Sequence, residues 1–147
     1  SAALSARLGL ALPATPCRSI QAAGRASLWL GPDEWLVRVP VEDLLALQTT
    51  LAHALEGMAH ALIDVSDRQV GLRVGGPLAA DVLNAGCPLD LDIEAFPIGM
   101  CTRTLIGRAG IILWRAGEAE FHVEVERSYV ANVHTALTRA ADALGSL

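Results

Sequence analysis

The stretch Leu62–Leu91 constrains the fold more than any other part of the chain. Two short apolar runs, 61–66 and 69–75, have strand-like composition and meet at a polar group, and the second ends in Gly75-Gly76-Pro77. Glycine permits a sharp exit from a strand, and proline already has the φ of a first helical turn. The stretch therefore predicts strand, turn, strand, tight turn and then a helix over about 77–85.

Strand-like runs and amphipathic helices also alternate in the rest of the chain. A turn composition at 31–34 separates two apolar runs, 28–30 and 35–39, which predicts a β-hairpin. A helix should follow, with carboxylates in its first turn, Gly57 at its end and a buried leucine stripe at Leu44, Leu47, Leu51 and Leu55. Later runs predict strands over 100–106, 111–115 and 120–126 and a closing helix over 129–144.

The hairpin-and-helix pattern occurs twice. Leu28-Trp29, a turn and 35–39 resemble Leu113-Trp114, a turn and 121–125, and in this alignment the second turn is one residue longer. A duplication of this kind predicts an α+β fold with helices packed on antiparallel sheets, built as two interlocked ferredoxin-like halves.

The domain boundaries follow from where this pattern begins. Residues 1–25 are expected to be an N-terminal arm, and residues 26–147 a single α+β domain. Leu4, Leu8 and Leu12 have the spacing of a short helix, and an arm that becomes ordered on a partner fits the same residues.

Composition excludes several functions. The chain has a net charge of −5 and contains no lysine, so it can build neither a P-loop nor a Schiff base, and nucleic acid is an unsuitable partner. Hydrophobic residues make up 52% of the chain, but no apolar run approaches the ~20 residues of a bilayer span. Such an excess of apolar residues favours a subunit with a partner interface. Cys17, Cys87 and Cys101 form no disulfide or CxxC pattern, which favours the cytoplasm.

The densest polar group is Asp64, Ser66, Asp67 and Arg68, beside the glycine-rich turn. It could form a small binding site, but Asp and Ser also bond their own backbone in hairpin turns, and this structural role is favoured. His53 and His60 lack a third ligand for a metal, and His122 is expected on a solvated strand face. No residue is therefore assigned a catalytic, cofactor-binding or metal-binding role.

Four segments carry a family resemblance. DVSDR (64–68) followed by VGGPLAADVL (74–83) is similar to a pattern of the folate-binding aminomethyltransferase superfamily, which includes the T-protein of glycine cleavage. LGPDEWL (30–36) and GCPLDL (86–91), in this order, narrow the resemblance to the gamma-subunit family of heterotetrameric sarcosine oxidases.

This resemblance implies an assembly that oxidatively demethylates sarcosine to glycine, with formation of hydrogen peroxide and methylenetetrahydrofolate. It also implies partners, the alpha, beta and delta subunits, with alpha as the expected direct contact. FAD, FMN, NAD, tetrahydrofolate and zinc would belong to those subunits, and the gamma subunit would be structural.

The residues permit a separate check on folate chemistry. T-protein-like enzymes place an acidic residue on the strand region after the middle loop, whereas residues 95–117 of this chain contain no Asp or Glu. A general base cannot be supplied from this segment. The sequence thus favours an accessory subunit over the alternative, a stand-alone folate-binding or aminomethyltransferase-like protein.

Overall fold

The computed structural model describes residues 2–145, which fall into two compact units divided between Asp64 and Val65. We call these unit 1 and unit 2. Both consist of antiparallel strands with packed helices, which confirms the predicted α+β class.

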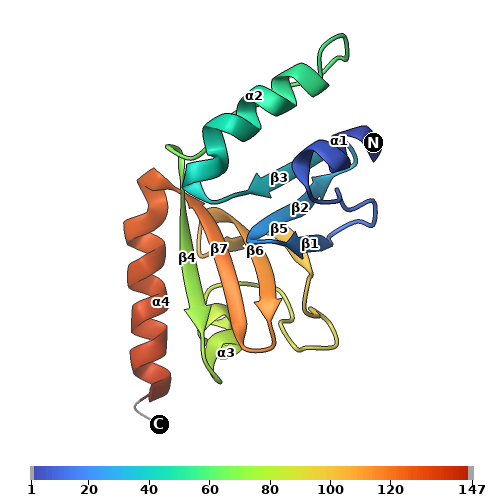
Figure 1. The fold of residues 1–147 in the computed structure, drawn as a ribbon. Coiled ribbons are helices and arrows are strands. Elements are labelled where there is room, and N and C mark those ends of the chain that lie inside the picture. Colours follow the sequence, from blue (N-terminus) through green and yellow to red (C-terminus); the bar gives the residue numbers. More distant parts are fainter. Residues whose placement is uncertain (1, 146–147) are drawn as a thin grey trace. The chain divides into compact units, whose positions relative to one another are not determined.

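Unit 1 is a three-stranded meander with two α-helices. Its strands pair antiparallel in the order β1-β2-β3 (Figure 1), and Leu8 and Leu10 pack with Leu47 and Leu51 in its core. The hairpin predicted around 31–34 is confirmed. The elements are α1 (Ala2–Leu8), β1 (Ser19–Ala22), β2 (Arg25–Gly31), β3 (Glu34–Arg38), the 3₁₀ helix η1 (Val41–Asp43) and α2 (Leu44–Ala54).

Unit 2 is a four-stranded antiparallel sheet in the order β4-β7-β6-β5. Its longest helix, α4, runs alongside β4 (Figure 1), and Val133 and Leu137 of this helix enter the core. The elements are β4 (Gln69–Gly75), α3 (Ala79–Asn84), β5 (Cys101–Ile106), β6 (Ala109–Gly117), β7 (Glu120–Glu126), the 3₁₀ helix η2 (Arg127–Tyr129) and α4 (Val130–Gly145).

The alternation in β7 determines which face of the sheet is covered. Phe121, Val123 and Val125 are at most 1% exposed, while Glu124 and Glu126 point to the other face. Because strand side chains alternate with a period of two, one face of β7 carries the core and the other is polar, as predicted.

The strand pairing shows the duplicated hairpin, as β2–β3 in unit 1 and β6–β7 in unit 2. The predicted alignment of the two hairpin turns is wrong. Gly31 pairs with Glu34 across the first turn and Gly117 with Glu120 across the second, and each hairpin has its register irregularity just before that glycine. Both turns therefore have the same length. Trp35 pairs with Trp29 in the first hairpin, and its counterpart Phe121 pairs with Arg115 in the second. Trp29 therefore corresponds to Arg115 and not to Trp114.

The strand predicted over 61–66 is also wrong. These residues adopt no regular structure, and Leu62 and Ile63 are 43% and 64% exposed. Apolar composition alone does not make a strand, and these exposed side chains gain no burial that would stabilise one. The second strand of that prediction is confirmed as β4, and the helix as α3.

Candidate functional site

The polar group at 64–68 is exposed apart from the half-buried Val65. Its turn is held by main-chain hydrogen bonds: the N–H groups of Arg68 and Gln69 both donate to the carbonyl of Val65, at 3.0 and 3.1 Å. Arg127 Nε donates to the carbonyl of Asp67 at 3.0 Å. These contacts give a structural reason for the turn.

The histidine and cysteine candidates do not come together. His53 Nδ1 lies 4.0 Å from Glu56 Oε1, and His60 Nδ1 lies 2.8 Å from the carbonyl of Met58. Cys87 and Cys101 are buried free thiols. Within residues 2–145, no three His, Cys, Asp or Glu side chains are grouped as a metal site would require.

A charged cluster lies on the polar face of the unit 2 sheet. Glu120 is bound from two sides: Arg73 Nε approaches its Oε1 to 2.9 Å, and His122 Nε2 approaches the same oxygen to 3.1 Å. The His122 ring packs on Trp114 with 4.9 Å between ring centroids. His122 is therefore half-buried, with 22% of its side chain exposed, and less solvated than predicted.

Electrostatics within this cluster favour an ionised carboxylate. The hydrogen bond from His122 and then that from Arg73 hold the pKa of Glu120 below its ordinary value. A carboxylate of lowered pKa that already accepts hydrogen bonds from an arginine and a histidine ring is a poor proton acceptor. The arrangement is that of a cross-strand structural cluster.

Arg115 is a buried residue that the sequence patterns did not single out. The residue is 6% exposed, its guanidinium stacks over Phe121 at 4.7 Å, and all its hydrogen bonds within the described part of the chain go to main-chain carbonyls. The acceptors are Leu91 at 2.9 Å, Phe96 at 2.8 Å and Glu118 at 2.7 Å. The guanidinium thus ties the loop before β5 and the β6–β7 turn to the end of β6.

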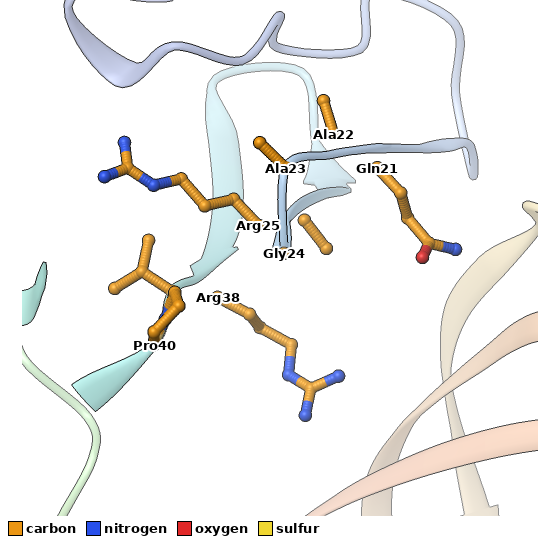
Figure 2. Close-up of a pocket in the computed structure, with 9 residues that line it drawn as sticks. Gln21, Ala22, Ala23, Gly24, Arg25, Arg38 and Pro40 are labelled. Atoms are coloured by element: carbon orange, nitrogen blue, oxygen red, sulfur yellow. The ribbon is translucent and has the colours of Figure 1, made fainter. Parts of the chain in front are cut away.

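A shallow pocket of about 560 Å³ lies beside the β1–β2 turn of unit 1. Figure 2 shows that the guanidinium groups of Arg25 and Arg38 point away from each other. Arg25 is already engaged, since it donates to the carbonyl of Leu8 at 2.6 Å and to Asp43 Oδ2 at 3.3 Å. The two arginines therefore do not converge on a shared anion.

An apolar hollow of about 490 Å³ in unit 2 lies between the end of α3, the β5–β6 turn and the start of α4. Val82, Ile106 and Leu137 contribute apolar surface, and Tyr129, which also lines the hollow, is 47% exposed. The segment 95–117 that supplies β5 and β6 carries no carboxylate, so neither strand can offer an acidic group to a folate.

No helix within residues 2–145 is both long and apolar enough to cross a bilayer.

Comparisons with known proteins agree on one family. The sequence profile of the sarcosine oxidase gamma subunit family matches residues 1–143. The sarcosine oxidase subunit gamma of an Arthrobacter species is 40% identical over 83% of this chain and 60% of its own length. Its counterpart in Corynebacterium sp. (strain U-96) is 36% identical over 87% of this chain and 62% of its own length.

A solved structure extends the agreement to three dimensions. A chain of the heterotetrameric sarcosine oxidase from Corynebacterium sp. U-96, in complex with pyrrole 2-carboxylate, superimposes with a TM-score of 0.85 and 32% identity. The match covers 96% of this chain and 72% of that one. The chain spans about three fifths of the length of the curated relatives. From the profile, the relatives and the fold together, this chain belongs to the sarcosine oxidase gamma subunit family.

Proposed function

We propose that this chain is a non-catalytic accessory subunit of a heterotetrameric, flavin-dependent sarcosine oxidase. Such an enzyme oxidatively demethylates sarcosine to glycine with formation of hydrogen peroxide and methylenetetrahydrofolate. The observation that carries the proposal is the superposition, at a TM-score of 0.85, on a chain of a heterotetrameric sarcosine oxidase. The acid-free segment 95–117 supports a role without folate chemistry.

The proposal assigns the chemistry to partner subunits. FAD, FMN, NAD, tetrahydrofolate and zinc would be held by the alpha, beta and delta subunits, and alpha would be the direct contact. The free thiols of Cys87 and Cys101 suit the cytoplasm as the site of assembly.

Two exposed apolar side chains of unit 1 are the proposed contact with a partner. Val41 and Leu45 are 83% and 77% exposed and lie four residues apart where η1 passes into α2. The duplicated unit has Arg127 and Ala131 at the corresponding positions, so the fold itself does not require large apolar groups there. Their exposure is explained if a partner covers them.

Copurification tests this proposal. The chain is coexpressed with the large flavoprotein subunits of a heterotetrameric sarcosine oxidase, and the flavin absorbance that is retained on its affinity tag is measured. We expect wild type to retain the flavoprotein and Leu45→Asp to lose most of it, because a carboxylate at the centre of an apolar contact is desolvated. Ala131→Asp, at the corresponding exposed position of unit 2, is the matched control, and this variant should retain the flavoprotein.

Two results would count against the proposal. The first is a wild-type chain that retains no flavoprotein, and the second is a Leu45→Asp variant that retains as much as Ala131→Asp. Circular dichroism of both variants establishes that they are folded.

Calorimetry with tetrahydrofolate addresses the alternative function. Tight binding to the isolated chain would favour a folate-binding or aminomethyltransferase-like protein, with the group at 64–68 as its site. We expect no heat of binding.

A further inference from the structure

In unit 1, a single arginine side chain joins the sheet to both helices. Arg25 on β2 donates to the carbonyl of Leu8, the last residue of α1, at 2.6 Å. It also donates to Asp43 Oδ2, at the start of α2, at 3.3 Å. A guanidinium therefore bridges the end of α1 and the start of α2 beside the β1–β2 turn.

The corresponding residues of unit 2 cannot form such a bridge. The strand register makes Ile111 the counterpart of Arg25, and the two 3₁₀ helices end at the counterparts Asp43 and Tyr129. Ile111 belongs to the core and is 4% exposed. At the equivalent place, the end of α3, the β5–β6 turn and the start of α4 surround the hollow of about 490 Å³.

The lining of this hollow is apolar and held in place. It includes core side chains that are each at most 8% exposed, namely Val82, Ile106, Val133 and Leu137. Gly107 N–H donates to the carbonyl of Gly86 at 2.9 Å, which fixes the turn against the end of α3. Small side chains, the alanines at 85, 109 and 136, leave the space open. A preformed apolar recess of this volume falls in the range of about 300–1,000 Å³ that is typical of small-molecule sites.

Three polar residues of the hollow have hydrogen-bonding groups to offer. Arg108, Tyr129 and Asn132 line it, and each of them is exposed. Within residues 2–145, none of these three side chains makes a hydrogen bond or an ion pair. Guanidinium, phenol and carboxamide groups all donate hydrogen bonds. Among the described residues of the lining Arg108 alone is charged, so the hollow favours an anion, and a planar guanidinium suits a carboxylate.

We propose that this hollow binds a small amphipathic carboxylate. Its apolar tail lies on Val82, Ile106 and Leu137, and its carboxylate pairs with Arg108. The bound molecule joins α3, the β5–β6 turn and α4, as Arg25 joins the equivalent elements of unit 1. The Val41–Leu45 contact belongs to unit 1, so this inference goes beyond the proposed function and does not depend on it.

Titration of the full 147-residue chain with octanoate, followed by NMR of its amide groups, tests the proposal. Octan-1-ol, which has the same apolar chain and no charge, is the matched probe. We expect octanoate to cause saturable shifts of the amide signals of residues 106–109 and 129–137. Because binding to the folded state alone is stabilising, octanoate should also raise Tm.

A charge variant tests the role assigned to the guanidinium. Arg108→Ala should weaken the binding of octanoate about threefold, the size expected of an exposed ion pair, and leave that of octan-1-ol unchanged. Arg139→Ala removes an exposed arginine of α4 that is not part of the lining, and should bind both probes as wild type does.

A filled hollow tests the location. Ala136→Phe places a ring in the space and should abolish the binding of both probes and the rise in Tm. Ala131→Phe, at an exposed position of the same helix outside the lining, should bind both as wild type does. Circular dichroism establishes that each variant is folded.

Three outcomes would overturn the proposal. One is the absence of saturable shifts in residues 106–109 and 129–137. Another is an equal loss of affinity for octanoate and octan-1-ol in Arg108→Ala, which would show that the hollow does not select a carboxylate. The third is wild-type binding by Ala136→Phe, which would place the probes elsewhere. Failure of these titrations would leave flavoprotein copurification unaffected, so the two proposals fail separately.

Discussion

At the residue scale, the guanidinium of Arg115 is the polar group on which the interior of unit 2 depends most. It is buried, has no acidic partner within residues 2–145, and satisfies carbonyls of Leu91, Phe96 and Glu118. A charged group is tolerated there because main-chain oxygens and the face of Phe121 replace water.

Replacing Arg115 with alanine should lower the free energy of unfolding by about 2–4 kcal/mol, since three carbonyls would lose a charged donor and a cavity would remain. Urea unfolding followed by circular dichroism measures the change. Arg108→Ala, at an exposed position on the β5–β6 turn, should cost less than about 0.5 kcal/mol. Equal losses for the two variants would contradict this role for Arg115.

Glu120 should make stability depend on pH in a defined direction. Its pKa is lowered in the folded state by His122 and then Arg73, so its contribution is fully present above its unfolded pKa. That contribution is lost as the pH falls through the lowered folded pKa. The difference in Tm between wild type and Glu120→Gln should therefore be largest near pH 7 and shrink as the pH is lowered toward 3. A difference that grows toward acid would show that the sign is wrong.

The burial of single residues could be predicted where apolar residues recur at a regular spacing. It could not be predicted where a residue's hydrogen-bond acceptors lie far away in the sequence. The alternation of Phe121, Val123 and Val125 was sufficient to predict their burial. Arg115 could not be identified, because its acceptors lie on a separate loop and main-chain carbonyls leave no mark in the sequence.

At the element scale, β6 is one of the two central strands of unit 2, since it is paired on both sides and Leu113 is fully buried. We expect Leu113→Ala to cost about 2–5 kcal/mol, because the cavity in a strand flanked on both sides cannot collapse. Leu105→Ala on the edge strand β5, where the side chain is 45% exposed, is the same chemical change and should cost less than about 1 kcal/mol. Denaturant midpoints of the two variants provide the comparison, and similar midpoints would argue against a central role for β6.

Local periodicity explains which elements could be predicted. The strands β4–β7 and the helices α2 and α4 each contain enough apolar residues at one spacing to be recognised. The strand predicted over 61–66 was inferred from apolar composition alone, and Leu62 and Ile63 are exposed in the structure. The duplicated hairpins were found, but tryptophan was a poor guide to their alignment, because Arg115 occupies the position of Trp29.

At the scale of the whole molecule, the chain consists of two units joined by an exposed segment without regular structure. Residues 56–64 are exposed, and no element lies between α2 and β4 in this part of the chain. Limited proteolysis with an enzyme that cuts after large apolar residues should therefore act first near Met58, Leu62 or Ile63. Mass spectrometry should find two fragments close to the two units. First cuts within β5–β7 would contradict this expectation.

The family could be inferred from the sequence because short motifs lie in a specific order, as LGPDEWL before GCPLDL. The division into two units could not be inferred from the sequence. No linker composition marks residues 57–64, and their apolar content suggested a strand instead.

The pairing of β4 with β7 has a consequence for how unit 2 folds. β5, β6 and β7 follow one another through two-residue turns, whereas β4 meets β7 only after the chain between Gly75 and Glu120 has been closed into a loop. Loop-closure entropy therefore places β4 last in assembly, after a local meander that can nucleate alone. A nascent or partly unfolded unit 2 would present the β7 edge bare. Until β4 docks, this edge is the point at which two copies can exchange strands and aggregate.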